Sequence, residues 1–523
     1  MRTIQRRGLK VNGLEPSRAR WPRYDAVVLA VCLTACAPDV APDGAVSLGD
    51  EAESFDLVIV GGRVMDPTSG LDAVRHVGLR SGEVAAISET PLTGTATLDA
   101  AGLVVAPGFI DLHAHGQDPV SHGYQAMDGV TTALELEIGV FPVARWYEGR
   151  GGRALINYGA SVSHQGARQR AMGGGLVRSN PDGTFSLGES SDEALYRAAT
   201  DTELSALARS MAQGLREGSV GFGFGLSYTP GVSHRELLQL FGLAATYEVP
   251  AFVHLRSSGA FVRGGPLAPF QEVIANAAAT GAAVHIVHLN STAGSQAEGA
   301  LAMIRGARER GIDVTTEAYP YTASASLIES PLFDGWVDRP ASAYASLQWV
   351  STGERLTRDS FERYRRDGGW VIMHGRSEDT NAWIVGQPDV IVASDGIPFS
   401  DGRAHPRAAG TFARILGHYA RDRSTLPLMD AVRKMTQLPA ERLAHVAPQM
   451  AGKGRLAVGA DADLTLFDPD RVIDRATYDA PDRFSAGIPH VLVGGTFVVR
   501  DGRLVEGVAP GRPIVGRHLR DGS

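Results

Sequence analysis

The sequence predicts an α/β fold, in which a TIM-like (β/α)8 barrel is joined to a small β-sandwich domain built from both ends of the chain. Three observations predict this fold. Eight short apolar segments recur between about residues 103 and 394, and helical patterns separate most of them. The chain ends instead carry short strands around Gly-Gly and Asp-Gly turns. Hydrophobic residues make up 44% and charged residues 21% of the 523 residues, which excludes a disordered chain, a collagen-like repeat and a coiled coil.

The first 36 residues have the pattern of an export signal. Basic residues precede an apolar run over residues 26–35. This run is too short to span a bilayer as a helix, which needs ~20 residues. It ends in Leu33-Thr34-Ala35-Cys36, which resembles the lipobox of bacterial lipoproteins and implies cleavage before Cys36 and lipidation of that residue. An ordinary signal peptide with an unrelated Cys is the alternative, and acidic residues within the segment leave a later start codon open.

Residues 37–53 are rich in Asp, Pro, Gly, Ser and Glu and predict a tether between the lipid and the folded part. Ala37, rather than Asp, follows the lipobox Cys, which favours the outer membrane. We therefore expect an exported protein that contacts a membrane only through its lipid anchor, on the periplasmic face of the outer membrane.

The small β domain is expected over residues 54–104 and 451–510. Asp56–Val64 is an apolar strand with a turn, and Ser81-Gly82 interrupts a second apolar stretch in the manner of a hairpin. Near the C-terminus, residues 462–467 form another strand pattern and residues 491–505 alternate about two glycine turns. We expect these distant segments to complete one domain, followed by a tail over residues 511–523.

The barrel is expected over residues 105–450. Helices are indicated by an apolar stripe at i, i+3, i+7 and i+11 in residues 203–217, and by the capping signature Ser233-His-Arg-Glu236. The connection before the last strand is too long for a plain crossover, so an inserted lid is expected at about 325–385. The eight predicted strands are 103–112, 130–137, 153–160, 219–226, 250–255, 283–289, 312–318 and 390–394.

Several of these strands end in metal-ligating residue types. His113 and His115 are two residues apart on one strand, so both imidazoles point the same way. His254, His288 and Asp395 end three further strands. Taken alone, a His at a strand end is usually a hydrogen-bonded core residue, and an Asp-Gly pair is usually a turn. The C-terminal ends of the strands of a barrel, however, meet at one face, and the active sites of such barrels lie there. The pattern therefore predicts a metal site with these five ligands. In a metal-assisted hydrolysis at such a site, Asp395 is expected to carry the proton of the attacking water as well.

The motif Pro107-Gly-Phe-Ile-Asp111-x-His113-x-His115 resembles the start of the amidohydrolase superfamily barrel, and further motifs resemble the D-aminoacylase family. The match covers about residues 55 to 510. It implies a zinc-dependent hydrolase, with one or two Zn²⁺ ions per chain, that cleaves the amide bond of N-acyl-D-amino acids. The further motifs are Gly225-Leu-Ser-Tyr228-Thr-Pro230, His254-Leu-Arg256, Tyr319-Pro-Tyr321-Thr-Ala-Ser324, Ser394-Asp-Gly396, His405-Pro-Arg407 and Gly459-Ala-Asp-Ala-Asp-Leu464.

The residue that would join two metal ions departs from the usual patterns. Many superfamily members use a carbamylated Lys, but apart from Lys10 the only lysines are Lys434 and Lys453, beyond the eighth strand. The Cys that D-aminoacylases use on the second strand is absent as well. Glu137 falls closest to that position, and a carboxylate can bridge two ions. We expect Glu137 to be a ligand, with Glu135 as the alternative.

Candidate substrate-binding residues follow from the same motifs. Tyr228 and Tyr321 could polarise the scissile carbonyl, and Arg256 and Arg407 could bind a substrate carboxylate, because a planar guanidinium matches that group. The resemblance places Asn290 where D-aminoacylases commonly have a Lys, which leaves the carboxylate contact and the exact substrate open. His285 is interpreted as a packing residue on the opposite strand face, and His164 as a residue that lines or supports the site.

The competing functions are limited by charge and by this ligand set. The formal net charge of −8, without a Lys/Arg cluster, excludes a nucleic-acid partner. Another amidohydrolase reaction at the same site, on an aryl amide, a dipeptide or a lactone, is the first alternative. A non-catalytic binding lipoprotein is the second, although it would not need a full ligand set with a proton-carrying Asp. The acyl group, D or L selectivity, the number of metal ions and the oligomeric state stay open.

Overall fold

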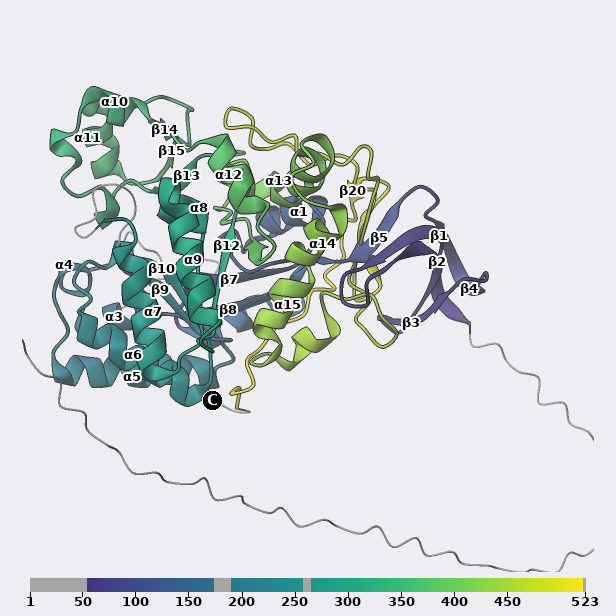
Figure 1. Ribbon diagram of the computed structural model, residues 1–523, viewed down its shortest axis with the longest axis horizontal. Helices are drawn as coiled ribbons and strands as arrows, with labels where there is room; N and C mark the ends of the chain where they lie inside the picture. The colour runs from purple at the N-terminus through teal and green to yellow at the C-terminus, as the bar shows by residue number, and fades with distance from the viewer. Residues whose placement is uncertain (1–53, 174–189, 257–264, 521–523) are drawn as a thin grey trace, which may run out of the picture. The chain divides into compact units, whose positions relative to one another are not determined.

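The computed structural model describes residues 54–173, 190–256 and 265–520 (Figure 1). The predicted signal, the lipidation site Cys36 and the tether lie outside these residues. Within them, no helix is both long enough and apolar enough to cross a membrane.

Eight parallel strands with helices around them form the predicted TIM-like barrel, and the strands lie side by side in the order in which they occur in the chain. Their burial is nearly complete; all 11 residues of β7, for example, are buried. Such strands read as continuous apolar runs because both faces are covered. The barrel strands are β6 (Phe109–Asp111), β7 (Val130–Val140), β8 (Asn157–Ser163), β9 (Phe222–Gly225), β10 (Ala251–His254), β11 (Val284–Ile286), β12 (Val314–Ala318) and β16 (Val390–Val392).

The expected first strand, 103–112, divides into two. Its first half, β5 (Val104–Pro107), pairs with strands of the other domain, and only β6 belongs to the barrel. The break falls at Gly108, whose N–H donates to the Asp463 carbonyl. Beyond the strand ends, contacts between the first and last strands nearly close the barrel. The Ser394 N–H donates to Asp111 Oδ1 at 3.0 Å, and His115 N–H donates to the Gly396 carbonyl at 2.9 Å.

The helices of the barrel bury the faces that the sequence pattern indicates. In α5, the predicted stripe Leu204, Leu207, Met211 and Leu215 is buried, and Thr200 and Glu203 form a capping box at its start. These helices are α1 (Pro119–Met127), α2 (Val143–Glu148), α3 (His164–Met172), α4 (Asp192–Tyr196), α5 (Asp201–Arg216), η2 (Leu226–Tyr228), α6 (His234–Tyr247), α7 (Ala268–Thr280), α8 (Leu289–Ala293), η3 (Gly294–Gln296), α9 (Ala297–Arg308), α13 (Arg407–Arg414), η6 (Ile415–Asp422), α14 (Leu428–Met435), α15 (Gln437–Ala444) and η7 (Pro448–Gly452).

One helix cap differs from the expectation. Ser233 caps α6 by accepting from the Glu236 N–H, but the Glu236 side chain does not turn back to the cap. It instead binds His164 and Arg168 in a fully buried cluster between α3 and α6. A buried carboxylate is costly unless it is paired, and this pairing outweighs the weaker capping contact.

Strands from both chain ends form the predicted small β domain and are joined in one mixed sheet of nine strands. β5 is the link, since it pairs with β1 in parallel and with β17 antiparallel. Figure 1 shows the purple N-terminal and yellow C-terminal strands side by side. The strands are β1 (Phe55–Asp66), β2 (Leu71–Arg80), β3 (Glu83–Ser88), β4 (Gly94–Asp99), β5, β17 (Leu464–Phe467), β18 (His490–Val493), β19 (Thr496–Arg500) and β20 (Arg503–Leu504).

Buried polar contacts join this domain and the C-terminal residues to the barrel. Buried Lys453 pairs with Asp463 at 2.6 Å, and the same carboxylate accepts from Asn157 Nδ2 of the barrel at 2.8 Å. The residues expected as a tail do not extend freely: Ile514 is buried, and its N–H donates to the Tyr158 carbonyl.

The segment between β12 and β16 forms a small unit with its own apolar core. Its three strands pair in the order β13-β15-β14. It contains β13 (Ser324–Leu327), η4 (Pro331–Phe333), η5 (Trp336–Asp338), α10 (Ala341–Ala345), β14 (Leu347–Trp349), α11 (Arg358–Asp367), β15 (Trp370–Met373) and α12 (Glu378–Val385).

Candidate metal centre

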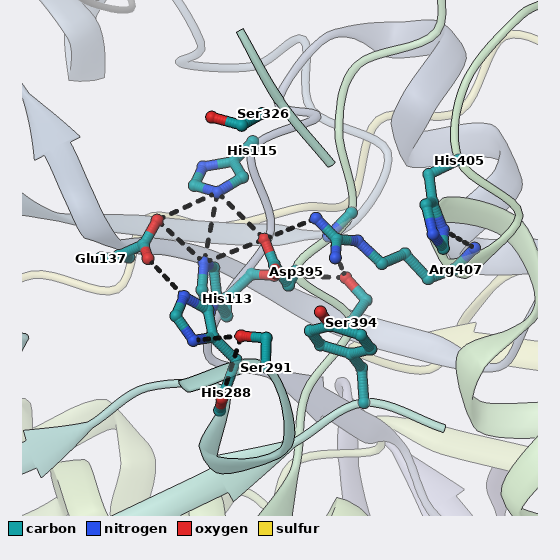
Figure 2. A network of polar contacts seen from close by, with 12 residues as sticks. His113, His115, Glu137, His288, Ser291, Ser326, Ser394, Asp395, His405 and Arg407 are labelled. Carbon is teal, nitrogen blue, oxygen red and sulfur yellow. Dashed lines mark hydrogen bonds and ion pairs between the residues drawn. The ribbon is translucent and has the colours of Figure 1, made fainter. Parts of the chain in front are cut away.

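Four side-chain atoms lie close together at the C-terminal end of the barrel (Figure 2). They are His113 Nε2 and His115 Nε2, which follow β6, Glu137 Oε2 on β7, and Asp395 Oδ1 after β16. His113 Nε2 lies 3.2 Å from His115 Nε2, 3.2 Å from Glu137 and 3.4 Å from Asp395. His115 Nε2 lies 3.3 Å from Glu137 and 3.4 Å from Asp395. Separations of this size are typical of neighbouring ligand atoms on one zinc ion, because two ligands at about 2.0 Å from the metal and at a tetrahedral angle lie about 3.3 Å apart.

The other oxygen of Glu137 faces a second group. Glu137 Oε1 lies 2.6 Å from His254 Nδ1, at the end of β10, and 2.9 Å from His288 Nε2, after β11. The two imidazole nitrogens are 3.1 Å apart. Three ligands leave a further coordination position open, as catalytic metal sites do. The two oxygens of Glu137 thus face two candidate metal positions, one on each side of the carboxylate.

The charges around these nitrogens match a cation. Burial lowers the pKa of His113, but Glu137, Asp395 and Glu317 raise it by more, so that the pKa lies well above its ordinary value. The pKa of His115 is raised in the same way against burial, by Glu135 and Asp395. Two imidazole nitrogens facing each other at 3.2 Å cannot both keep a proton, whereas a divalent cation between them would take the place of both. This donor set fits a metal ion in each group.

The backbone of two ligands is strained. His288 has a φ of 34° and Asp395 a φ of 52°, in the left-handed region that residues with a Cβ rarely adopt. Such a conformation costs about 1–3 kcal/mol and persists where the surrounding structure imposes it, often at functional sites. Both residues follow the end of a barrel strand, and the turn aims their side chains at the shared centre.

Buried polar groups hold the imidazoles in place from behind. His113 Nδ1 lies 2.5 Å from Glu317 Oε1 and His115 Nδ1 lies 2.8 Å from Glu135 Oε2, while Ser291 Oγ lies 2.8 Å from His288 Nδ1. Partners of this kind fix the tautomer, so that the opposite nitrogen presents its lone pair to the metal. Glu135 faces the far nitrogen of His115, whereas Glu137 faces both ligand groups.

Sequence reasoning missed Glu317. It lies on β12, is fully buried, and joins His113 to His285, whose Nε2 is 3.0 Å from Glu317 Oε2. His285 therefore packs within the barrel, as expected, but it also helps to support a ligand. A Glu within an apolar strand is the signal that pointed to Glu137, and the same reasoning applied to β12 could have found Glu317.

Asp395 is bound on its other side by Arg407. Arg407 Nη2 lies 2.8 Å from Asp395 Oδ1, and the Arg407 side chain has an exposed fraction of 0%. Burial raises the pKa of Asp395, but Arg407 and His113 lower it by more, so that the pKa falls below its ordinary range. The guanidinium also lies over the Tyr319 ring. Arg407 thus keeps the carboxylate of Asp395 ionised and in position.

A cavity of about 290 Å³ opens above the metal ligands. The inserted unit between β12 and β16 forms one wall of it, which is the place expected of a lid. The residues that line it are His115, Glu135, Glu137, Ile138, Gly139, Tyr228, His254, His288, Ser291, Thr292, Ser324, Ala325, Ser326, Leu327, Glu329, Leu332, Trp370, Met373, Asp395 and Pro398.

Three predicted substrate-binding residues lie elsewhere. Arg256 pairs with Glu272 at 3.0 Å, the Tyr321 hydroxyl donates to Asp474 at 3.1 Å, and neither side chain lines the cavity. Asn290 is buried, and its Nδ2 donates to the Tyr319 carbonyl. None of the three lines this cavity, because each binds a partner from another element, and their direct contact with a substrate stays a prediction. Tyr228 does line the cavity, with its hydroxyl 3.5 Å from Ser326 Oγ, while Arg407 lies behind Asp395.

Comparison with known proteins agrees with this geometry. The model of the amidohydrolase family matches residues 96–499. An N-acyl-D-glutamate deacylase of Alcaligenes xylosoxydans xylosoxydans is 33% identical over 490 residues, which cover 85% of this chain and 94% of that one. A D-aminoacylase of the same organism is 28% identical, with the same shares covered.

A similar structure is that of an N-acyl-D-glutamate deacylase from Bordetella bronchiseptica, complexed with zinc and a phosphonate inhibitor that mimics the tetrahedral intermediate. It has a TM-score of 0.74 and 28% identity, and the alignment covers 88% of this chain and 100% of that one. A D-aminoacylase structure described as having a binuclear metal centre has a TM-score of 0.74 and 25% identity over the same shares.

Proposed function

This chain belongs to the amidohydrolase family, and we propose that it is a zinc-dependent hydrolase that cleaves the amide bond of N-acyl-D-amino acids. The observation that carries the proposal is the Glu137 carboxylate, which lies between two groups of imidazole ligands at the base of a cavity. The substrate class is supported by the relatives, among which N-acyl-D-glutamate, N-acyl-D-aspartate and D-amino-acid deacylases each match most of the chain.

In the proposed reaction, His113, His115 and Asp395 would hold one ion and His254 and His288 the other, with Glu137 as the ligand shared by both. Zinc bound there supplies a Lewis acid that polarises the amide carbonyl and makes hydroxide available near neutral pH. Asp395 accepts the proton of the attacking water and returns it to the leaving nitrogen, which needs a proton to depart as an amine.

Neighbouring residues prepare these groups. Arg407 holds Asp395 ionised, so that the carboxylate is ready to accept a proton. The Tyr228 hydroxyl lines the cavity and is the donor placed to stabilise charge on the carbonyl oxygen. Burial raises the pKa of Tyr228 above its ordinary value, so the hydroxyl keeps its proton at neutral pH and can donate it in a hydrogen bond.

The test is hydrolysis of paired D- and L-N-acetyl amino acids by the zinc-loaded protein, with amine release as the readout. Hydrolysis of D-enantiomers that is lost with a chelator and restored by zinc is the expected result. Hydrolysis confined to aryl amides, dipeptides or lactones would overturn the substrate class and favour another amidohydrolase reaction. Metal-free protein as isolated, with no turnover after zinc loading, would instead favour a binding lipoprotein.

The location of the protein is part of the same proposal. Cys36 and the preceding Leu33-Thr34-Ala35 support a lipid anchor on the periplasmic face of the outer membrane. Metabolic labelling with a fatty acid and membrane fractionation test it: wild type should carry the label in the membrane, and Cys36→Ala should be unlabelled. A wild-type protein that is soluble and unlabelled would refute the anchor.

A further inference from the structure

The inserted unit contributes an apolar part of the cavity wall, beside Ser324 and Ser326. Leu327 on β13, Leu332 on η4, and Trp370 and Met373 on β15 line it, and all four are half-buried. Such a wall removes an aliphatic or thioether chain of a ligand from water, at about 25 cal/mol for each Å² of apolar surface buried. The part of a substrate that lies here is therefore one with a hydrocarbon stem.

A single carboxylate outside the metal centre interrupts this wall. Glu329 follows β13 and lines the cavity, and its Oε2 accepts from the Gly369 N–H at 2.9 Å. That bond ties the side chain to the start of β15. Among the described residues, none forms an ion pair with Glu329, and the Gly369 N–H is the hydrogen-bond donor to its carboxylate.

Positive groups do not line the described part of the cavity. The lining contains neither Lys nor Arg. The two arginines predicted to bind carboxylates are committed elsewhere, Arg407 to Asp395 and Arg256 to Glu272. An acidic substrate side chain would thus meet Glu329 with no Lys or Arg of the described lining to balance it, and like charges placed together beside apolar walls repel strongly.

We propose that Glu329 makes this site selective for N-acyl-D-amino acids whose side chain has an aliphatic stem and ends in a cation, of the lysine or arginine type, and that it excludes acidic side chains. The apolar wall takes the stem and the Glu329 carboxylate takes the ammonium or guanidinium. The inference rests on the proposed deacylase function and deepens it. It also separates this chain from the relatives named for D-glutamate and D-aspartate.

The test compares three N-acetyl-D-amino acids of similar length: lysine, norleucine and glutamate. Norleucine has the stem without the charge, so it reports on the catalytic centre and the apolar wall alone. Wild type should show kcat/KM in the order lysine, norleucine, glutamate. Glu329→Gln should lower the value for lysine by about tenfold, the scale of one lost hydrogen bond to a charged group. The same change should leave norleucine within about twofold and should raise the value for glutamate.

Binding of the free D-amino acids, measured by calorimetry on the metal-loaded protein, separates this inference from the proposed function. Tighter binding of D-lysine than of D-norleucine, lost in Glu329→Gln, would support the inference even if no amide were hydrolysed. A wild type that prefers glutamate, or an equal effect of Glu329→Gln on lysine and norleucine in both assays, would overturn it.

Discussion

Glu137→Gln is expected to cost the protein at least one metal ion and most of its activity. The substitution keeps the shape of the side chain and removes the charge that both ligand groups share. Oε2 lies 3.2 and 3.3 Å from His113 and His115, and Oε1 lies 2.6 and 2.9 Å from His254 and His288. Glu137 is 2% exposed, so water screens little of this charge. Removing one partner from a buried ion pair costs about 3–5 kcal/mol, which is about 10²–10⁴-fold in a binding constant.

The assay is metal content per chain after dialysis, measured for wild type, Glu137→Gln and Glu135→Gln side by side. Glu135 is the matched control, because it lies on the same strand two residues away and contacts only the far nitrogen of His115. We expect Glu135→Gln to lower the affinity for metal by about 10–100-fold, as for other residues that hydrogen-bond to a metal ligand. Circular dichroism shows whether each variant folds. Full occupancy in Glu137→Gln with loss in Glu135→Gln would reverse the roles, and full occupancy in both would refute the bridge.

Three further substitutions test the proton carrier, the support of the ligands and the joint between the domains. Asp395→Asn should lower kcat by ~10² or more, the scale of a lost general base, with part of the metal retained; turnover near the wild-type level would remove Asp395 from the mechanism. Glu317→Gln should weaken metal binding by about 10–100-fold, because an amide cannot accept from two imidazoles as a carboxylate does; unchanged affinity in a metal titration would show that His113 does not depend on it. Lys453→Met should lower the free energy of unfolding by about 3 kcal/mol, since Asp463 would stay buried without its cation; an unchanged denaturation midpoint would contradict this.

The sequence by itself determined the barrel, its order of strands and the small domain from both chain ends. Burial of strands and helix faces leaves a periodic apolar pattern, and that pattern is a local property of the chain. The local pattern also shows which residues stand at strand ends, namely His113, His115, His254, His288 and Asp395. The fold then brings those ends together at one face, whatever the rest of the chain does.

Only the tertiary structure decided where the long polar side chains go. Arg256 pairs with Glu272 on α7, and this contact forms because α7 packs against the strand before it. Glu317 acquires its role from His113, 204 residues away in the chain. Glu329 faces the cavity because an inserted sheet lies over the barrel. Such contacts depend on distances between elements, which no local pattern encodes. The same distances decide that Glu137 faces both ligand groups, whereas Glu135 on the same strand faces only the far nitrogen of His115.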